Sequence, residues 1–312
     1  MEKLKILKDI LGRCFTSNEE TLFYCPYCNH HKKKFSVNTD KNCYKCWICD
    51  THGRSIRRIV RRFGSYTQLR EWDKLDGRED ILQFDELFSE IKKETSNKSL
   101  TLPEEFATLT GRSQPLSAIK AVNYLENRGI TKEDIVRWKI GFCTRGQFEG
   151  RIIVPSFDEE GYLNYFIARS YTNDWRKYMN PSTTKDIVFN HLFIDWDSDL
   201  SLVEGVFDAI KAGANSIPLL GSTLREDSKL FQEIVKNDTP VFVALDIDAE
   251  KKAFGIISKL ISYGAEVYKI DTSGFEDVGE MSKQEYQERK KNAEFVNPDT
   301  FKIEHSLNSI GV

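Results

Sequence analysis

The sequence lacks any apolar stretch close to the ~20 residues that a membrane-spanning helix requires, so we expect no membrane segment. Its first residues contain no apolar core followed by a cleavage site. We therefore predict no signal peptide and expect the chain to remain in the cytoplasm. The sequence also lacks internal repeats and the P-loop pattern G-x-x-x-x-G-K-[ST]. The absence of a P-loop excludes the common helicase and ATPase motor from these residues.

Acidic and basic residues are distributed unevenly along the 312 residues. Residues 1–70 contain 15 Lys and Arg against 6 Asp and Glu, a net charge of +9, whereas the remainder carries −12. A basic module next to an acidic body indicates binding to a polyanion at one end of the chain. The acidic body is compatible with a metal-dependent site and equally with simple solubility.

Five of the seven cysteines lie between positions 25 and 49. In a cytosolic chain, such clustering indicates metal binding rather than disulfides. Two CxxC pairs flank a hairpin-like stretch at 34–38, which is the signature of a zinc ribbon. The candidate ligands are Cys25, Cys28, Cys43, Cys46 and Cys49. The spacing alone does not choose among the last three.

An arginine-rich segment follows the cysteines. Residues 51–70 contain six arginines and no acidic residue, and apolar residues recur at helical spacing within 56–63. Beside a zinc ribbon, this composition favours phosphate contact over a merely solvated helix face. Tyr44 and Trp47 are predicted to be exposed, where they could stack on unpaired bases or cover the zinc. The candidate DNA-binding residues are Arg54, Arg57, Arg58, Arg61, Arg62 and Trp47.

Composition also suggests the domain boundaries. A polar, charged stretch with one short helix predicted at 81–91 is interpreted as a linker that lets the zinc module move. Helical and then strand-rich patterns follow it, and after them strands alternate with helices. The expected parts are a zinc-ribbon module at 1–70, a linker at 71–102, an α+β subdomain at 103–196, an α/β domain at 197–280 and a helical tail at 281–312.

Two apolar runs of strand length end on carboxylates, and a helical pattern follows each. The first run ends at Glu204, and the second, at 241–245, ends at Asp246 and Asp248. Such βα units form parallel sheets, in which function collects at the carboxyl edge of the strands. Carboxylates that converge there repel one another unless a cation lies between them, and their hard oxygen atoms suit Mg²⁺.

These carboxylate patterns resemble a known fold. Glu-Gly-x-x-Asp, from Glu204 to Asp208, follows one strand, and Asp-x-Asp follows a later one. Together they resemble the TOPRIM fold, which bacterial primases and topoisomerases share. That fold has a further aspartate in a later loop, where Asp277 is the matching position and Asp271 a weaker rival.

The cysteine region resembles that of DnaG-type primases of bacteria and tailed phages. Their pattern of Cys-Pro-x-Cys, Phe-x-Val and Tyr-x-Cys-x-x-Cys-x-x-x-Gly falls on Cys25, Cys28, Phe35, Val37, Tyr44, Cys46, Cys49 and Gly53. The resemblance implies one structural zinc ion, bound by Cys25, Cys28, Cys46 and Cys49. The alternatives for a single ligand position are Cys43, His30, His31 and His52.

A third block, which other TOPRIM proteins lack, narrows the resemblance to the DnaG-type family. It matches at Tyr124, Leu125, Arg128, Gly129, Ile130, Arg151, Pro155, Arg169, Lys177, Tyr178 and Asn180. The resemblance implies a groove for template and nucleotide, lined by Arg151, Arg169, Lys177, Tyr178 and Asn180. The sequence departs from the family at Phe189-Asn190, where a lysine is common.

The implied fold is a TOPRIM α/β domain, with a parallel-rich sheet flanked by helices, preceded by an α+β primase subdomain and a small zinc ribbon. The implied activity is a DNA primase that makes short RNA primers on single-stranded DNA by metal-dependent nucleotidyl transfer. Asp246, Asp248 and Asp277 are then expected to bind Mg²⁺ or Mn²⁺. Glu204 is expected to be a metal ligand or a general base, and Asp208 to orient one of these groups.

The implied partners are a single-stranded template, ribonucleoside triphosphates and a separate hexameric helicase, which residues 281–312 are expected to contact. Two other functions fit parts of the pattern. A topoisomerase or nuclease is the nearest other enzyme, although a topoisomerase needs a large gate domain for which this chain has no room. A non-catalytic adaptor that binds single strands is the alternative from another class.

Overall fold

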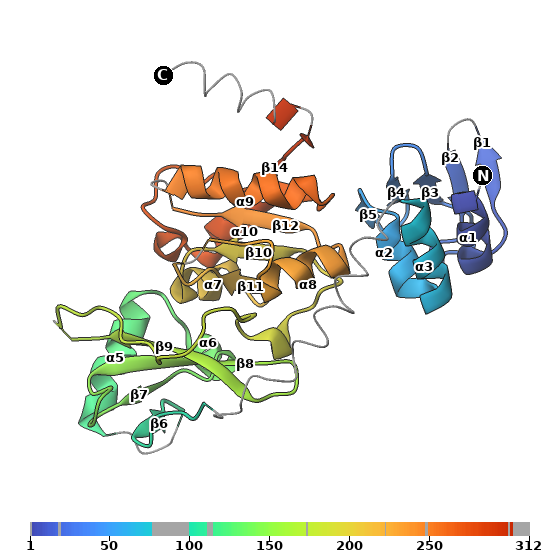
Figure 1. Cartoon of the computed structure of the whole chain (residues 1–312). Helices are drawn as coiled ribbons and strands as arrows, with labels where there is room; N and C mark the ends of the chain where they lie inside the picture. Colours follow the sequence, from blue (N-terminus) through green and yellow to red (C-terminus); the bar gives the residue numbers. More distant parts are fainter. Residues whose placement is uncertain are drawn as a thin grey trace. The chain divides into compact units, whose positions relative to one another are not determined.

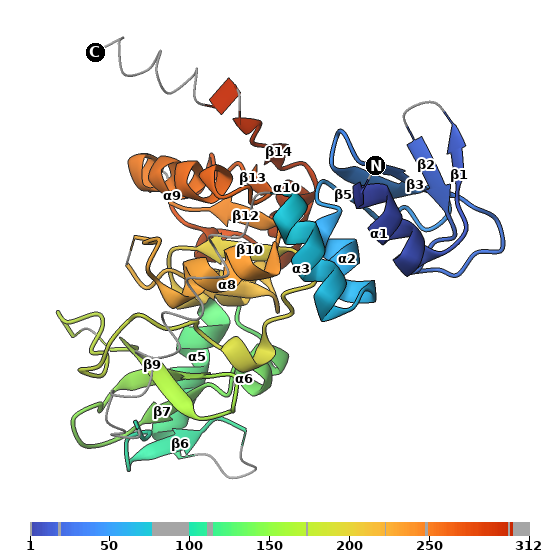
Figure 2. The ribbon, with the colours of Figure 1, turned by 45° about the vertical axis from the view of Figure 1, so that its right-hand side comes forward.

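The computed structural model describes residues 2–17, 20–76, 100–110, 115–172, 174–221, 223–246, 249–298 and 300–301. It divides into two compact units, one of residues 1–97 with 236–238 and one of residues 98–235 with 239–312. Figures 1 and 2 show the helices and strands of both units. The helix expected at 81–91 lies outside the described residues. None of the helices within the described ranges is long and apolar enough to cross a membrane.

The first unit is an antiparallel sheet with helices against it. Its strands pair in sequence order: β1 (Phe15–Ser17), β2 (Glu20–Phe23), β3 (Phe35–Asn38), β4 (Cys43–Cys46) and β5 (His52–Gly53). The helices are α1 (Glu2–Leu11), α2 (Arg57–Phe63) and α3 (Tyr66–Leu75). Leu7, Phe35, Ile59 and Trp72, at most 1% exposed, form the core between sheet and helices. Because α3 belongs to this core, the unit extends beyond the expected boundary at residue 70.

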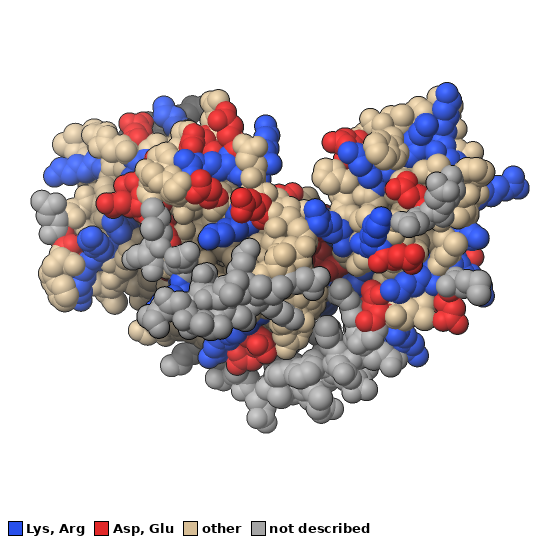
Figure 3. All heavy atoms as spheres, turned by 90° about the horizontal axis from the view of Figure 1, so that it is seen from above, with Lys and Arg blue, Asp and Glu red and all other residues tan. Residues whose placement is uncertain are grey.

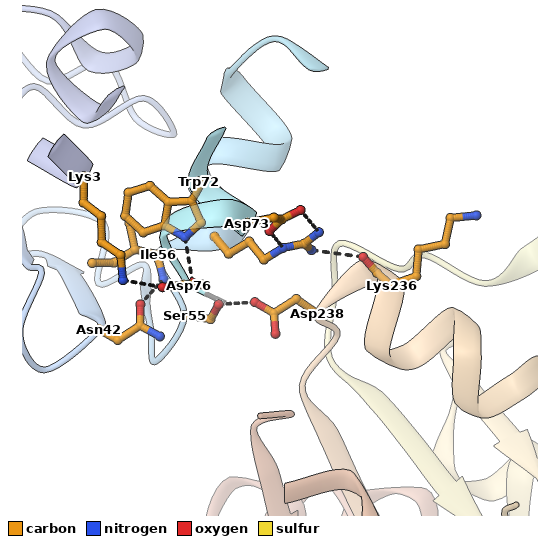
Figure 4. A network of polar contacts seen from close by, with 10 residues as sticks. Lys3, Asn42, Ser55, Ile56, Trp72, Asp73, Asp76, Lys236 and Asp238 are labelled. Atoms are coloured by element: carbon orange, nitrogen blue, oxygen red, sulfur yellow. Dashed lines mark hydrogen bonds and ion pairs between the residues drawn. The ribbon is translucent and has the colours of Figure 1, made fainter. Parts of the chain in front are cut away.

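A buried ion pair joins α2 to α3 (Figure 4). Arg57 donates from Nε to Oδ1 of Asp73 at 2.5 Å and from Nη2 to Oδ2 at 2.8 Å. The side chains of this pair are 7% and 2% exposed. Nearby, the Trp72 indole donates to Oδ2 of Asp76 at 3.0 Å, and Lys3 pairs with the other oxygen of Asp76. This network fixes the three helices to one another.

The second unit begins with an α+β subdomain, as expected. Its antiparallel sheet consists of β6 (Phe106–Thr108), β7 (Gly141–Cys143), β8 (Arg151–Phe157) and β9 (Leu163–Ser170) in that order. The helices α5 (Leu116–Asn127) and α6 (Lys132–Arg137) lie between β6 and β7 in the chain. Buried side chains such as Phe142, Ile153 and Ala168 form the interior of the subdomain.

A five-stranded sheet of order β11-β10-β12-β13-β14 completes the second unit. Its strands are β10 (Leu200–Val203), β11 (Ser216–Pro218), β12 (Val241–Ala244), β13 (Val267–Lys269) and β14 (Glu294–Phe295). The first four strands in the sheet are parallel, whereas β14 runs antiparallel to β13. The associated helices are α7 (Val206–Ala212), α8 (Lys229–Asn237), α9 (Glu250–Ser262), α10 (Lys283–Lys291) and the 3₁₀ helices η1 (His191–Phe193) and η3 (Val278–Glu280).

The register of this sheet determines where the site lies. β10 and β12 are neighbours, and Val203 pairs with Ala244, so both strands end at the same edge. Glu204 follows β10 directly, and Asp246 lies two residues after the end of β12. The predicted parallel-rich α/β domain is confirmed. Because β14 joins its sheet, the domain extends beyond residue 280, and part of the expected tail belongs to it.

Candidate active site and zinc site

Four thiols converge in the first unit. The Sγ atoms of Cys25, Cys28, Cys46 and Cys49 all lie within 4.8 Å of one another. Sγ of Cys25 is 3.8 Å from that of Cys49, and Sγ of Cys28 is 3.9 Å from that of Cys46. A tetrahedral zinc ion with Zn–S bonds of ~2.3 Å requires sulfur–sulfur separations of about 3.8 Å. The four thiols therefore form a zinc-binding site, and Cys43 is not part of the cluster.

The sheet brings the two cysteine pairs together. Phe35 of β3 pairs with Cys46 of β4, and the Trp47 amide donates to the carbonyl of Lys34 at 2.9 Å. The Cys46 amide donates to the carbonyl of Thr51 at 2.7 Å, which closes the second turn. Asp50 in this turn has a φ of +57°, a conformation that aspartate tolerates better than most residues. With all four positions taken by protein ligands, the site is structural.

The surface of the zinc-binding unit carries exposed aromatic rings beside lysines. Trp47 is 62% exposed and has the Lys45 ammonium 5.2 Å from its ring centre. Tyr24 is 46% exposed, and the Lys33 ammonium lies 5.5 Å from its ring centre. Tyr44, in contrast, is 5% exposed and packs against Phe35 at 5.5 Å between ring centres. The expectation that Tyr44 is exposed for stacking on bases is therefore wrong, whereas Trp47 remains a candidate.

The predicted DNA-binding arginines fall into two groups. Arg54 and Arg62 are exposed, and Arg58 and Arg61 are partly exposed. Arg57 is 6% exposed and bound to Asp73, so it is not presented to a nucleic acid. This corrects the expectation for Arg57, which the structure assigns to joining two helices. On the face drawn in Figure 3, basic and acidic side chains are both scattered over the zinc-binding unit.

Carboxylates gather at the edge where β10 and β12 end. Glu204 follows β10, Asp208 lies in the first turn of α7, Asp246 follows β12, and Asp277 caps η3. Asp208 accepts a hydrogen bond from the Gly205 amide at 2.7 Å. Asp277 accepts one from the Glu280 amide at 3.0 Å. Asp248 lies outside the described residues.

The crowding of these carboxylates affects Asp208. Burial, and after it the charges of Asp277 and Asp246, raise the pKa of Asp208 from its ordinary 3.8 to about 7, against hydrogen bonds from the amides of Gly205 and Gly279. A Cβ on Gly279 would lie 2.9 Å from Oδ1 of Asp208 and 3.0 Å from Oδ1 of Asp277. The loop therefore requires glycine here, and the oxygens around it form an all-oxygen donor set that suits a hard cation.

Glu204 has a lysine as partner. The Lys252 ammonium, on α9, donates to Oε1 of Glu204 at 2.6 Å. Oε2 of Glu204 is buried and accepts no hydrogen bond from any residue that the structure describes.

The pKa of Asp208 predicts an unusual pH dependence of stability. Because the pKa in the folded chain, about 7, lies above the ordinary 3.8, the folded state binds this proton more tightly than the unfolded state. The resulting stability is complete below the unfolded pKa and is lost as the pH rises through the folded pKa. Without divalent metal and above about pH 8, we expect Asp208→Asn to be more stable than the unchanged chain by a few kcal/mol and therefore to melt at a higher temperature. Below about pH 4, the two chains should differ little in stability.

Thermal melts across this pH range test the expectation. Asp271→Asn is the contrasting variant, since hydrogen bonds from the amide and then the hydroxyl of Ser273 lower the pKa of Asp271. Its loss should reduce stability at neutral pH instead of raising it. A melting difference for Asp208→Asn that does not change with pH would contradict the raised pKa.

A group of arginine and tyrosine side chains lies next to the carboxylates. The Tyr124 hydroxyl accepts hydrogen bonds from Nε of Arg128 at 3.0 Å and from Nε of Arg169 at 3.1 Å. The Arg169 guanidinium lies 4.6 Å from the centre of the Tyr178 ring. Desolvation raises the pKa of Tyr178, Arg169 and Arg128 lower it, and the nearby charge of Asp208 raises it. The basic and acidic groups thus meet within one site.

Arg128 belongs to this group but was not among the predicted site residues. Its guanidinium lies 5.1 Å from the ring centre of Phe207 on α7, next to Asp208 in the chain. The signal was present, because Arg128 is one of the positions that match the DnaG-type block. Only the structure shows that it reaches the carboxylate edge.

The other predicted groove residues hold the segment after β9 in place. Arg151 is 1% exposed, forms an ion pair with Asp174 and donates to the carbonyl of Arg176 at 2.9 Å. Asn180 accepts a hydrogen bond from the Ala168 amide at 3.2 Å. Lys177, between these anchors, is exposed. A direct nucleotide contact by Arg151 stays a prediction, and its burial favours a positioning role.

One cavity of the second unit lies away from this site. It has a volume of about 720 Å³ and lies between α6 and the start of β11, with Phe193 and Asn190 on its wall. None of the candidate carboxylates lines it. Since Ser216, at the beginning of β11, also lines it, the cavity is at the opposite end of the strand from the carboxylate edge.

Comparison with known proteins agrees with this arrangement. The sequence is 22% identical over 295 residues to the DNA primase of Halalkalibacterium halodurans, covering 77% of this chain and 49% of that protein. It is 25% identical over 208 residues to the Escherichia coli DNA primase, covering 51% of this chain and 34% of that protein. It is 23% identical over 310 residues to the Thermotoga maritima DNA primase, covering 84% of this chain and 54% of that protein. In sequence, this chain is similar to DnaG-type primases.

Solved structures show the same likeness in fold. The zinc-binding and RNA polymerase domains of the Aquifex aeolicus primase align with a TM-score of 0.50 and 18% identity, over 95% of this chain and 84% of that one. A DnaG primase catalytic domain bound to single-stranded DNA aligns with a TM-score of 0.54 and 19% identity, over 63% and 78%. No protein-family model matches the sequence. The chain spans about half the length of the curated primases that it matches most fully.

Proposed function

We propose that this chain is a DNA primase, which synthesises short RNA primers on single-stranded DNA during replication. The observation that carries the proposal is the convergence of Glu204, Asp208, Asp246 and Asp277 at one sheet edge, next to Arg128 and Arg169. Similarity to DnaG-type primases in sequence and fold supports it. In the proposed reaction, a primer 3′-hydroxyl attacks the α-phosphorus of a ribonucleoside triphosphate, and pyrophosphate leaves.

The carboxylates are proposed to hold Mg²⁺ or Mn²⁺. Asp246, Asp277 and Asp248 are the proposed ligands, and Glu204 is either a further ligand or the general base. When bound, the metal supplies activation of the hydroxyl and neutralisation of the leaving phosphates. Asp208 holds the turn that carries Glu204 through its bond to the Gly205 amide, so its proposed role is to orient the site.

The basic side chains near the carboxylates are proposed to bind the template and the triphosphate. Arg169 and Tyr178 stack on each other beside Asp208, and exposed Lys177 lies next to Tyr178. Guanidinium groups fixed in advance stabilise phosphate charge without reorganising during the reaction. Arg151 and Asn180 are proposed to hold the segment that carries Lys177 and Tyr178 in place.

The zinc-binding unit is proposed to hold single-stranded DNA through exposed arginines and Trp47. We expect Arg54→Gln combined with Arg62→Gln to weaken binding and to reduce the slope of log affinity against log salt by about 1.4, since each lost phosphate contact on a single strand contributes about 0.7. Fluorescence anisotropy with a labelled oligonucleotide measures this slope. Arg225→Gln, at a 63% exposed side chain outside the zinc-binding unit, is the control. An unchanged slope in the double variant would remove these arginines from the interface.

Two further proposals concern the cellular setting. We expect the chain to act in the cytoplasm with a separate hexameric helicase. The proposed contact for that helicase is 281–312, of which the structure describes α10 and β14. The helix α10 is polar and partly exposed, which suits a transient contact.

Template-directed incorporation tests the proposed function. The purified chain is mixed with single-stranded DNA of known sequence, Mg²⁺ and labelled ribonucleotides, and each ribonucleotide is omitted in turn. A primase stops where the omitted base is required by the template. Tight binding to the DNA without any incorporation would favour the non-catalytic adaptor instead.

A further inference from the structure

The contact between Lys252 and Glu204 is not explained by the proposed chemistry. The Lys252 ammonium is 2.6 Å from Oε1 of Glu204, and the two side chains are 18% and 26% exposed. Lys252 projects from the first turn of α9, which follows the loop that carries Asp246. A lysine therefore occupies one oxygen of a carboxylate that the metal-dependent reaction is expected to use.

Charge explains why a cation is placed here. Glu204 lies at the same edge as Asp208, Asp246 and Asp277, and a group of carboxylates is stable only with compensating positive charge. Since Oε2 of Glu204 is buried and accepts no hydrogen bond within the described part of the chain, Lys252 is its main stabilising partner there. Without metal, the ammonium thus supplies charge that a divalent cation would otherwise supply.

The same contact is weakened once a metal ion binds at Oε1. Two cations on one carboxylate oxygen repel each other, because like charges about 4 Å apart repel even at a partly exposed site. Lysine is suited to leave, since its ammonium is a compact charge on a flexible four-carbon stem. A released ammonium remains close to the site, where the nearest new negative charge is the triphosphate that accompanies the metal.

We propose that Lys252 is an exchangeable counter-ion of the active site: it holds Glu204 in place without metal, competes with the metal for Oε1, and on release binds the phosphates of the incoming nucleotide. Lys252 is thus a positioning residue that couples metal entry to nucleotide entry. The proposal rests on the proposed function only for the identity of the nucleotide, since competition for Glu204 is a property of the free chain.

Mn²⁺ binding to the full chain tests the competition in the absence of nucleotide. We expect Lys252→Met to bind Mn²⁺ about tenfold more tightly than the unchanged chain in electron paramagnetic resonance titrations, a change that corresponds to about 1.4 kcal/mol. Lys252→Arg keeps a cation on Glu204 and should bind Mn²⁺ like the unchanged chain. Lys251→Met is the matched control, because it removes the same charge from an exposed neighbouring position.

A double-variant cycle separates competition from a general effect of charge. In a Glu204→Gln background, Lys252→Met should leave the Mn²⁺ affinity unchanged, because the oxygen for which the two cations compete has lost its charge. Equal or weaker Mn²⁺ binding by Lys252→Met would overturn the proposal, and so would equal tightening in Lys251→Met. Thermal melts establish that each variant folds.

The nucleotide half of the proposal has its own measurement. In primer synthesis, Lys252→Met should raise the KM for ribonucleotides even though it binds Mn²⁺ more tightly. If the KM for ribonucleotides fell together with the Mn²⁺ dissociation constant in Lys252→Met, this would contradict the proposal that the released ammonium binds the phosphates. If Lys252→Met binds Mn²⁺ more tightly as expected but the unchanged chain makes no RNA, the proposed function fails while the counter-ion exchange stands.

Discussion

Replacing Cys46 with serine is expected to release zinc and unfold the zinc-binding unit. Cys46 is completely buried, and its sulfur lies 3.9 Å from that of Cys28 within the four-thiol cluster. Structural zinc supplies about 10–16 kcal/mol of apparent binding energy in finger peptides. That amount is comparable to the ~5–15 kcal/mol that stabilises a typical domain. The sheet of short strands and its three helices cannot offset such a loss.

Zinc content and limited proteolysis measure this outcome. Cys46→Ser should contain no zinc and should be cleaved readily within residues 2–76, while the second unit stays resistant. Cys43→Ser is the matched control, since Cys43 lies on the same strand, β4, but outside the cluster. Full zinc content and unchanged proteolysis in Cys46→Ser would contradict the assignment of the ligands.

Replacing Asp246 with asparagine should lower RNA synthesis by on the order of 10³-fold or more, because it removes a negative charge from the metal-binding edge without changing side-chain volume. Asp246 follows a central strand of the sheet, and its charge acts on the buried Asp208. Binding of single-stranded DNA should be retained, since the proposed DNA contacts are basic and lie elsewhere.

The control for this prediction is Asp271→Asn. Asp271 follows the neighbouring strand β13, but it is exposed, forms hydrogen bonds with Ser273 and pairs with Arg289. Its variant should keep nearly full RNA synthesis. Comparable losses in both variants would indicate that the acidic surface as a whole, and not the carboxylates around Asp208, supports the reaction.

The zinc ligands and the carboxylate edge could be predicted because both depend on local sequence. The spacing of the cysteines predicts a zinc ribbon, and the resemblance to the DnaG-type pattern selects Cys46 and Cys49 over Cys43. Glu204 and Asp246 each follow an apolar run, and the carboxyl ends of neighbouring parallel strands meet at one edge. In both cases the chemistry is fixed by residues within a few positions of a recognisable element.

Features that depend on distant partners could not be predicted. Arg57 looked like its exposed neighbours, and only the position of Asp73 on the next helix shows that it is buried. Lys252 reaches Glu204 across 48 positions of the chain. The burial of Arg151 depends on the loop at Asp174, and the pairing of β14 with β13 depends on how the chain returns after α10. Periodicity carries no information on such contacts.

RNA synthesis by the unchanged chain tests the central claim most directly. The chain, with its zinc content verified, is incubated with single-stranded DNA and ribonucleotides, with and without Mg²⁺, and the products are separated on a denaturing gel. We predict short RNA complementary to the template that forms only with the divalent metal. No RNA under any of these conditions, from a chain that binds both zinc and single-stranded DNA, would contradict the account.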